Sequence, residues 1–555
     1  MREVKKKHDG ALKDEIKFWA DQLAEEAVKK AGAGTVTCKC AASPSGAKHI
    51  GNLFDIMKSY NVYKSVLKKG HPARFIFTSD DRDPLRTIPP RLPTLDAKWV
   101  PTERFEKRLS EYLGHPYTDI PDPFECCQSW AEHFTKVWLD GIYTLIPEKE
   151  IHAFSNTELY EKGDFDPYIE IIFKNIKKAR KIISKFQKSV TFDYIPFHAI
   201  CERCGKITTK VVGFDIDKKA VSYICSGREL AGKYKIEGCG HRGETSWHNG
   251  KLAWRFETPA QMALFHVTVE PFGKEHAEGT VRSSKVILKD LFEIDPPLFP
   301  IYEFLLVGGK KMSAREGNVY LTQEILDIIE PEVFAYFYTK RSLKQRDLDL
   351  KNIYHLVDEF DKAERIFFGA EKLDNEKEKM NIIRMYETAI QEIPKELPVR
   401  IPYKFAAVVA QTTAHLEHAI KVLTATSHVK RKLSGEDMDV IRQRLNLAKN
   451  WVVKFSPENM IKINEKIPES IAKKLTDVQK QALRDLVIFI NDKPTMDEEE
   501  LTNKFYEIIN YHNMKSADFF SAAYQVLIDK KSGPKLAQFI IAIGELKVKK
   551  LLEQI

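Results

Sequence analysis

The sequence predicts an α/β protein in which a parallel sheet is split by a long insertion and is followed by an all-α region. Strand-like runs at 35–41 and 75–77 flank a glycine-containing turn and a helical stretch at 49–67, which together make a βαβ unit. From Glu324 onward, essentially only helical periodicity is found. One such helix, at 353–367, is followed closely by a glycine, as helices commonly are.

The elements around this unit have weaker signals. Apolar residues at helical spacing predict an amphipathic helix over 11–30. The pattern becomes irregular from 90 to 250, and strand signals return at 254–256, 266–270 and 302–307. We therefore expect the second half of the sheet to follow the insertion.

The bulk composition bounds the class of protein. At 555 residues the chain should hold roughly three or four domains. Its formal charge of +8, from 87 Lys+Arg and 79 Asp+Glu, permits a polyanionic partner without demanding one. No run approaches the roughly 18 apolar residues that a membrane span needs. The charged N-terminus lacks the apolar segment of a signal peptide, so a cytoplasmic location is expected.

Four of the eight cysteines form a metal-binding pattern. Cys201 and Cys204 are separated by two residues, and Cys225 and Cys239 follow, with His241 close behind. Such a set suits tetrahedral Zn²⁺ in a closed structural site. Five residues compete for four places; we favour the four cysteines, with His241 in place of Cys225 or Cys239 as the alternative. Of the remaining cysteines, Cys126 and Cys127 are expected to be buried thiols, and Cys38 and Cys40 are expected to be strand residues.

The turn after the first predicted strand carries the segment Pro44-Ser45-Gly46-Ala47-Lys48-His49-Ile50-Gly51-Asn52. Gly46 and Gly51 would let the backbone approach a nucleotide closely. His49 and Asn52 lie three residues apart, so both can point from the first helical turn toward one ligand. The N-terminal dipole of this helix would favour phosphate groups. The alternative is a turn with a solvated histidine.

A second motif, Gly308-Gly309-Lys310-Lys311-Met312-Ser313, follows the strand-like run at 302–307. Its glycines predict a mobile loop, and the ammonium groups of Lys310 and Lys311 can close over pyrophosphate. The alternative is a basic surface loop in which Met312 only packs. The sequence has no conventional P-loop, because its nearest match ends at Lys233 and is followed by tyrosine.

Two carboxylates, Asp80 and Asp81, end the second predicted strand. Since the carboxyl ends of parallel strands share one edge of a sheet, both are candidates to bind a cationic group of a substrate. The alternative for each is a solvated acidic turn or a cap for the next segment.

The motifs around His49 and Lys311 resemble the HIGH and KMSKS signatures of class I aminoacyl-tRNA synthetases. Almost from end to end, the chain resembles the archaeal-type class I lysyl-tRNA synthetases. The stretches that carry this narrower resemblance are 80–86, 269–277, 302–304, 331–333 and 533–537. The resemblance implies a Rossmann-like catalytic domain, activation of lysine by ATP with Mg²⁺, and transfer of lysine to the terminal adenosine of tRNA-Lys.

The resemblance also implies roles for residues at matching positions. Catalytic roles fall to His49, Asn52, Lys311 and Ser313. ATP contacts are expected from these four and from Pro44, Gly46, Gly51, Gly273, Glu275, Lys310 and Met312. Contacts with lysine are expected from Ala41, Ser43, Trp254, His276 and Tyr302, with Asp80 and Asp81 as carboxylate candidates. A core position is the alternative for the tryptophan.

Three positions depart from the family pattern. Asn52 stands where the signature usually ends in histidine, and Glu275 is one methylene longer than the usual aspartate. Ala314 replaces the second lysine of the KMSKS-like signature. The missing charge would then come from Lys310, Lys311 or Arg315.

The resemblance also suggests an order of domains. The expected boundaries are 1–90 and 251–325 for the two halves of the catalytic domain, 91–250 for the insertion with its zinc module near 198–245, 326–370 for stem-contact helices and 371–555 for a helical anticodon-binding domain. Three aromatic residues of this domain are either stacking platforms for RNA bases or core residues: Tyr403, Phe405 and Tyr511.

Three other hypotheses for the function stay open: a class I synthetase of another specificity, a nucleotidyltransferase, and a noncatalytic RNA-binding paralogue.

Overall fold

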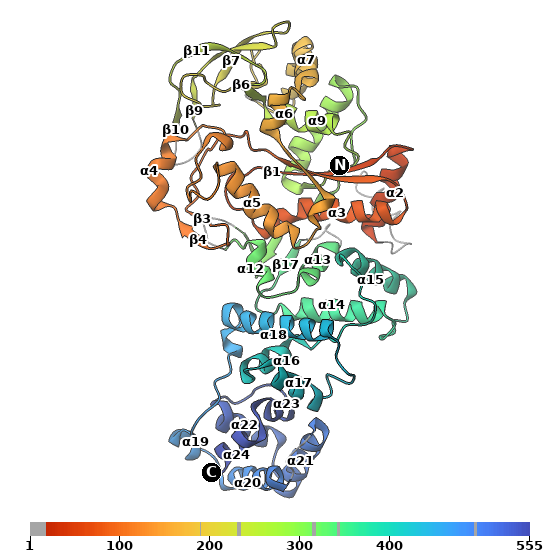
Figure 1. Cartoon of the computed structure of the whole chain (residues 1–555), viewed down its shortest axis with the longest axis vertical. Coiled ribbons are helices and arrows are strands. Elements are labelled where there is room, and N and C mark those ends of the chain that lie inside the picture. The colour runs from red at the N-terminus through yellow and green to blue at the C-terminus, as the bar shows by residue number, and fades with distance from the viewer. Residues whose placement is uncertain (1–17, 189, 230–234, 313–317, 341–344, 493–496) are drawn as a thin grey trace. The chain divides into compact units, whose positions relative to one another are not determined.

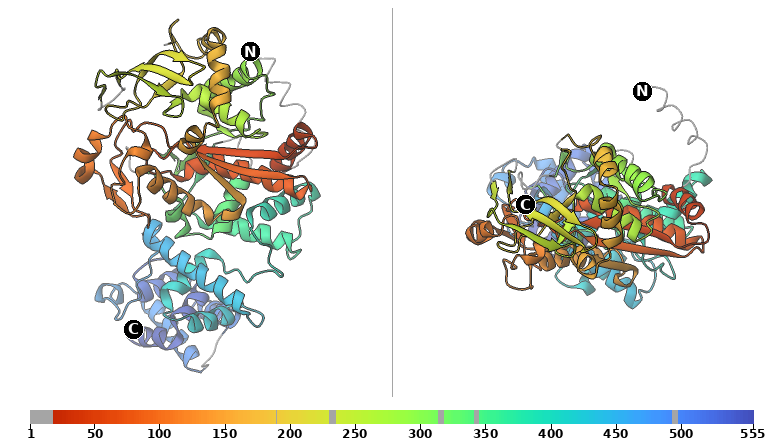
Figure 2. Two further views of the ribbon diagram at one scale, coloured as in Figure 1. Left: turned by 45° about the horizontal axis from the view of Figure 1, so that its top comes forward. Right: turned by 90° about the horizontal axis from the view of Figure 1, so that it is seen from above.

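Figures 1 and 2 show the computed structural model of the chain, which describes all residues except 1–17, 189, 230–234, 313–317, 341–344 and 493–496. Its contacts divide the chain into two compact units. The first unit contains 1–325, 331–349 and 369–393, and the second contains 326–330, 350–368 and 394–555. Each unit therefore brings together segments that lie apart in the sequence.

The first unit is built on a parallel sheet with strand order β1-β2-β5. β1 (Val36–Ala42) and β2 (Ala73–Ser79) pair in parallel, and the helix α3 (Leu53–Lys68) joins them. β5 (Ile151–Ser155) pairs with the other edge of β2. The predicted βαβ unit is confirmed, and Figure 1 shows α3 alongside these strands.

Beyond β1, the sheet continues through single residues. Val269 forms isolated parallel bridges with Cys38 and with Leu298. The strand predicted over 266–270 is therefore reduced to one bridging residue. His266 has a positive φ of 49°, so the backbone turns just before this bridge and cannot extend as a strand.

The first element after the insertion is a helix and not a strand. α9 (Trp254–Leu264) begins where a strand was predicted over 254–256. Periodicity cannot distinguish a strand from a buried helix over three residues. Phe256, Ala260 and Ala263 of α9 are buried, whereas Trp254 is exposed and lines a cleft, so the two aromatic residues lie on different faces of a helix.

The strand predicted over 302–307 is two short strands, β14 (Ile301–Tyr302) and β15 (Leu305–Val307). β15 pairs with β16 (Lys310–Lys311) in a hairpin and with β17 (Arg346–Leu348) in parallel. β17 corrects the prediction of essentially only helices in the C-terminal region. A strand of three residues is too short to produce a detectable period.

A buried lysine and a buried tyrosine fix the start of α3. Lys58 donates from its ammonium group to the carbonyl oxygens of Tyr338 and Lys340, at 2.9 and 2.5 Å. These carbonyls end the helix α13 (Pro331–Thr339), where they have no intrahelical donor. The hydroxyl of Tyr338 in turn donates to the carbonyl of Ile50, at 2.7 Å. The turn that carries His49 is therefore tied to α13.

The insertion contains a three-stranded antiparallel sheet of order β11-β8-β7. Its strands are β7 (Lys210–Asp215), β8 (Ala220–Ile224) and β11 (Arg242–Ser246), which form the yellow and olive ribbon in Figure 2. Val221 and Tyr223 of β8 share one hydrophobic cluster with Ile76 of β2 and Phe256 of α9. The insertion thus packs on the parallel-sheet domain through a common core.

The other elements of the first unit are helices and short strands. The helices are α2 (Trp19–Ala31), η1 (Ile50–Asn52), α4 (Glu103–Glu111), η2 (Tyr117–Asp119), α5 (Trp130–Tyr143), η3 (Glu148–Glu150), α6 (Asn156–Lys162), α7 (Asp166–Lys174), α8 (Ile176–Ile183), α10 (Lys274–His276), η4 (Ala277–Val281), α11 (Arg282–Val286), η5 (Ile287–Leu291), α12 (Thr322–Leu326) and α15 (Glu376–Ala389). The strands are β3 (Arg91–Pro93), β4 (Trp99–Pro101), β6 (Phe197–Ala199), β9 (Gly227–Glu229), β10 (Lys235–Glu237), β12 (Gly250–Leu252) and β13 (Phe272–Gly273).

The described residues of the second unit form helices and connecting segments, as the periodicity predicts. Its α14 (Tyr354–Phe367) ends just before Gly369, whose φ of 72° is the left-handed conformation expected after a helix. The other helices are α16 (Tyr403–Thr412), α17 (Leu416–Ala425), α18 (Gly435–Phe455), η6 (Pro457–Asn459), α19 (Glu469–Ala472), α20 (Asp477–Asp492), α21 (Glu498–Tyr511), α22 (Ser516–Ile528), α23 (Leu536–Ile543) and α24 (Glu545–Leu552). Among the helices that the structure describes, none is long and apolar enough to span a membrane.

Candidate active site

A cleft of about 370 Å³ lies at the carboxyl ends of β1 and β2, beside the start of α3. This is the edge of a parallel α/β sheet at which ligands bind. The wall contains predicted site residues from separate parts of the chain: Ala41, Ser43, Asn52, Asp80, Trp254 and His276. The rings of Trp254 and His276 meet edge to face, with centroids 5.6 Å apart. The structure therefore brings most of the predicted lysine-binding residues to one cavity.

The two adjacent aspartates after β2 have different surroundings. Asp80 lines the cleft, and its Oδ1 accepts hydrogen bonds from Asn156 Nδ2 and Gln261 Nε2, at 2.9 and 3.1 Å. Asp81 is buried, and its Oδ1 accepts from the backbone N–H and the hydroxyl of Thr157, both at 2.9 Å. Asp81 thus serves the first turn of α6, which matches the cap alternative.

The sequence prediction missed a carboxylate on α3. Asp55 lines the cleft, three residues after Asn52 and on the same face of the helix. Burial raises the pKa of Asp55 to about 7, although the hydroxyl of Tyr302 donates a hydrogen bond to it. Tyr302 also stacks on Phe54, with ring centroids 5.3 Å apart. The i, i+3 spacing from Asn52 was the signal that could have found this residue.

His49 is held as a neutral hydrogen-bond donor. Its Nδ1 accepts the backbone N–H of Gly51 at 3.1 Å, and its own N–H donates to Asn52 Oδ1 at 3.1 Å. Burial and the nearby ammonium groups of Lys48 and Lys311 lower the pKa of His49 to about 4. With Nδ1 an acceptor, the single ring proton of the neutral form is on Nε2. The side chain can therefore donate one hydrogen bond to a ligand at neutral pH.

The two signature-like motifs meet in space. A Cβ atom on Gly51 would lie 2.9 Å from Met312 Cε and 2.9 Å from the His49 ring. The N–H of Ile50 donates to the carbonyl of Tyr320, at 2.9 Å. Residues far apart in the sequence therefore form one surface, and the absence of a side chain at Gly51 permits their contact.

The β15–β16 hairpin presents the lysines of the second motif. Gly308 and Gly309 have φ angles of 57° and 76°, which favour glycine. Lys310 and Lys311 are both exposed, and the ammonium of Lys311 lies 3.6 Å from the centroid of the Phe304 ring. Three residues of the predicted motif lie outside the described residues: Ser313, Ala314 and Arg315.

The remaining predicted ATP contacts lie on turns. Gly46 has a φ of 127°, which favours glycine. The carbonyl of Pro44 accepts the indole N–H of Trp130, at 2.7 Å, which fixes the turn before His49. A Cβ on Gly273 would lie 2.6 Å from the carboxylate of Glu275, so these two predicted residues are close neighbours.

Comparison with known proteins matches residues 17–392 to the family described as "tRNA synthetases class I (K)". The match covers more than half of the chain. The chain belongs to this family. A Lysine--tRNA ligase of Natronomonas pharaonis is 37% identical to this synthetase over 530 residues, covering 95% of each chain. A Lysine--tRNA ligase of Methanocaldococcus jannaschii is 31% identical over 547 residues, covering 95% of this chain and 98% of the relative.

Among solved structures, a glutamate tRNA ligase from Elizabethkingia meningosepticum aligns over 94% of this chain and 99% of that chain. The TM-score is 0.43 at 13% identity. The α/β architecture is established by the synthetase's own parallel sheet.

The synthetase brings four cysteines together in the insertion. The sulfur atoms of Cys201, Cys204, Cys225 and Cys239 all lie within 4.8 Å of one another. Cys201 and Cys239 are 3.7 Å apart, and Cys204 and Cys225 are 3.6 Å apart. His241 is not in this group, whose four-sulfur donor set fits a closed tetrahedral Zn²⁺ site.

A second group of metal-ligand type is formed by Asp122, Cys126, Cys127 and His133. The Nδ1 of His133 lies 3.2 Å from Asp122 Oδ1 and 3.3 Å from Cys126 Sγ. The Nε2 of His133 lies 3.0 Å from the carbonyl of Pro93, which fixes the ring with Nδ1 free to bind a metal. Cys126 is exposed and Cys127 half-buried, so the expectation of two buried thiols is wrong. The spacing Asp-x3-Cys-Cys-x5-His was the missed signal.

Proposed function

We propose that the chain is a lysine–tRNA ligase that activates lysine with ATP and then esterifies tRNA-Lys. The carboxylate of lysine attacks the α-phosphorus of ATP, and the bond to the β-phosphate breaks, giving lysyl-adenylate and pyrophosphate. The 2′-hydroxyl of the terminal adenosine then attacks the adenylate carbonyl and releases AMP. The observation that carries this proposal is the meeting of the two family motifs beside a carboxylate-lined cleft.

The first step needs positioning and charge stabilisation more than a general base, because a carboxylate is already nucleophilic. We assign to His49 Nε2–H and Asn52 a hydrogen-bonding role toward the phosphates. Lys310 and Lys311 would neutralise the leaving pyrophosphate. Lys48 lines the cleft and offers a further ammonium group. Mg²⁺ bound to the triphosphate would add charge neutralisation as part of the substrate.

We assign the side chain of the substrate lysine to Asp55. Its carboxylate lines the cleft beside Tyr302, and an ammonium ligand would replace the solvation that burial removes. Trp254 and His276 offer aromatic faces for the aliphatic part and the cation. Ala41 and Ser43 lie at the end of β1, where the backbone can approach the amino acid closely.

For the RNA we propose a cavity of the second unit, about 600 Å³ in volume. Phe405 and His428 stack there, with centroids 4.6 Å apart and an angle of 25° between the rings. Lysines at 404, 530 and 535 line the same cavity. An aromatic pair surrounded by cations suits a base and phosphates of a single-stranded loop such as the anticodon.

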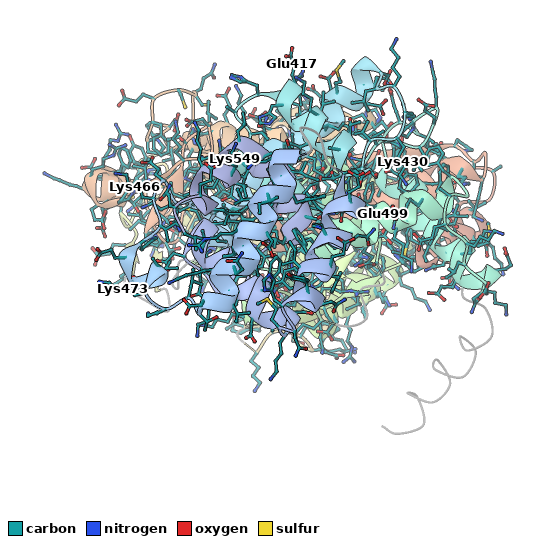
Figure 3. All side chains as sticks on the ribbon, turned by 90° about the horizontal axis from the view of Figure 1, so that it is seen from below. Glu417, Lys430, Lys466, Lys473, Glu499 and Lys549 are labelled. Carbon is teal, nitrogen blue, oxygen red and sulfur yellow. The ribbon has the colours of Figure 1, made fainter. Side chains whose placement is uncertain are left out.

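Charge on the open surface of the second unit does not by itself mark an RNA face. Figure 3 shows Lys466 and Lys473 among the side chains of this unit, together with the acidic Glu417 and Glu499. These four residues are all exposed. Because positive and negative side chains are mixed on this surface, it does not distinguish an RNA-binding face. The cavity around His428 does, since lysines line it.

Each metal-ligand group is proposed to hold a structural Zn²⁺. The four cysteines supply sulfur ligands, and the second group supplies sulfur, nitrogen and carboxylate oxygen. Neither group is needed for adenylation, which uses no metal-bound hydroxide. Their proposed task is to hold the insertion in its fold.

The experiment that tests the function is pyrophosphate exchange with lysine and a panel of other amino acids, with and without tRNA-Lys. We expect exchange with lysine and no other member of the panel. Exchange with a different amino acid would show that the enzyme activates that amino acid and not lysine. No exchange in folded, zinc-replete protein under either condition would favour a noncatalytic RNA-binding paralogue.

The RNA cavity has its own test. His428→Ala and Lys535→Ala should raise the KM for tRNA-Lys by roughly tenfold, since a base stack or a phosphate contact is lost. Lys473→Ala is the matched control, because Lys473 is exposed and pairs only with the exposed Glu469 among the contacts described. Equal effects of all three substitutions would reject the cavity as the RNA site.

A further inference from the structure

The floor of the cleft contains a buried ion pair. Lys39 points from β1 and Glu270 from the segment beside it, and both side chains line the cleft. Lys39 Nζ and Glu270 Oε1 are 2.8 Å apart, with the two residues 0% and 2% exposed. The N–H of Lys39 also donates to the carbonyl of Val269, at 2.9 Å, so the sheet register fixes the pair.

Only half of the Glu270 carboxylate is used. Its Oε1 faces Lys39, whereas its Oε2 is buried and has no hydrogen-bond donor among the described residues. A buried carboxylate oxygen without a donor is costly, and such atoms are rare in folded proteins. The neighbouring Asp80 contrasts with it, because two side-chain amides donate to one of its oxygens. A ligand in the cleft that donates a hydrogen bond to Glu270 Oε2 would therefore remove this cost.

The cleft contains a second carboxylate at a separate place. Asp55 projects from α3, whereas Glu270 directly follows Val269, which bridges to β1. The two lie close enough for Glu270 to contribute to the raised pKa of Asp55. A ligand with two separated ammonium groups would satisfy both carboxylates at once. Lysine is such a ligand.

We propose that Glu270 Oε2 binds the α-ammonium group of the substrate lysine, while Lys39 holds the carboxylate of Glu270 in place. This inference rests on the proposed function and adds a further substrate-binding residue to it. The α-ammonium and the reacting carboxylate are attached to the same carbon atom. Anchoring the first therefore positions the second for attack, so Glu270 affects kcat as well as KM.

The test uses Glu270→Gln and three ligands. Glutamine keeps an oxygen for Lys39 and places an amide where Oε2 was. Lysine has both ammonium groups, 6-aminohexanoate lacks the α-ammonium, and norleucine lacks the ε-ammonium. Affinities are measured by calorimetry with tRNA-Lys present, and by lysine-dependent pyrophosphate exchange. We expect lysine and norleucine to bind about tenfold or more weakly, and 6-aminohexanoate to change by less than about twofold.

Asp55→Asn is the matched control with the opposite pattern. It should weaken lysine and 6-aminohexanoate and spare norleucine. Equal weakening of lysine and 6-aminohexanoate by Glu270→Gln, or no weakening of lysine, would overturn the inference. Should the single variant unfold, the double variant Lys39→Met/Glu270→Gln removes both buried charges, and the same ligand pattern is expected. Wild-type protein that does not bind lysine would instead reject the proposed function.

Discussion

Asp55 is the residue whose ionisation should control lysine binding. Burial holds its pKa at about 7, so its carboxyl is largely protonated at pH 6 and ionised at pH 8. Only the ionised form attracts an ammonium group, and the ammonium in turn favours ionisation. We therefore expect the affinity for lysine to rise from pH 6 to pH 8. Calorimetric titration at pH 6, 7 and 8 measures this rise.

The control is the same titration of Asp55→Asn. Asparagine cannot ionise, so lysine should bind roughly tenfold more weakly at pH 8 and with little dependence on pH. Parallel pH profiles of the two proteins would assign the titration to another group and remove Asp55 from the role proposed here.

The residues of the site could be predicted from the sequence only where a motif marks them. His49, Asn52 and Lys311 lie in short signatures, and the structure places the two signatures in contact. Asp55 has only its i, i+3 spacing from Asn52 as a signal, and Glu270 lies in the family-like stretch 269–277 without an assigned role. An acidic residue in a helix or beside a strand is usually solvated, so these signals alone do not assign a site role. Their meaning depends on burial and on the cavity that they face, and neither property is local in the sequence.

The contact between the start of α3 and the β16 loop can be tested at Gly51. A methyl group there would lie 2.9 Å from both Met312 and the His49 ring, so alanine must push the two motifs apart. We expect Gly51→Ala to lower kcat/KM for ATP in pyrophosphate exchange by about tenfold or more. Gly213→Ala is the control, since the nearest atom to its new methyl lies at 3.8 Å. A Gly51→Ala variant with wild-type kinetics would contradict the contact.

The two metal-ligand groups predict one zinc ion each. Elemental analysis should show the loss of one ion in Cys225→Ser and of the other in His133→Ala, whereas Cys38→Ala retains both. Removal of zinc by a chelator should lower the Tm by about 5 °C or more, because the three-stranded sheet around Cys225 loses its link. Unchanged metal content in His133→Ala would show that the second group binds no zinc.

Elements were predictable in proportion to their length. The βαβ unit contains a long helix and two strands of seven residues, and it is confirmed, although its second strand was predicted only over 75–77. The glycine-containing turn and the long helix before that run supplied the context that its length could not. The run at 254–256 and β17 are three residues long, and three residues do not define a period. In the first case the aromatic residues belong to a helix, and in the second a strand forms only because β15 is available to pair with it.

The composition of the two units could not be derived from the order of the sequence. Periodicity marks 376–389 as helical, yet only tertiary packing decides that α15 belongs to the first unit. The second unit likewise gathers the short segments 326–330 and 350–368 with 394–555. Such a unit needs contacts that hold separate segments of chain together.

Arg444 makes those contacts in the second unit. Its guanidinium bonds Glu330 Oε1 at 2.7 Å, both oxygens of Asp361 at 2.5 and 3.0 Å, and the carbonyl of Ile401 at 3.1 Å. These partners come from the three separate segments of the unit. All three charged side chains are buried, so each depends on the others for its charge to be tolerated.

We therefore expect Arg444→Met to destabilise the second unit by about 3–5 kcal/mol, because two buried carboxylates lose their cation. Urea unfolding measures the change in the free energy of unfolding. Hydrogen exchange of the amides in α18 then localises the effect to this unit. Arg442→Ala is the control on the same helix; its pair with Asp439 is exposed and should contribute less than about 1 kcal/mol. Adding Glu330→Gln and Asp361→Asn to Arg444→Met should restore much of the lost stability, since no buried charge is then left without a partner. If Arg444→Met were no more destabilising than Arg442→Ala, the joining of the three segments would have to depend on apolar packing instead.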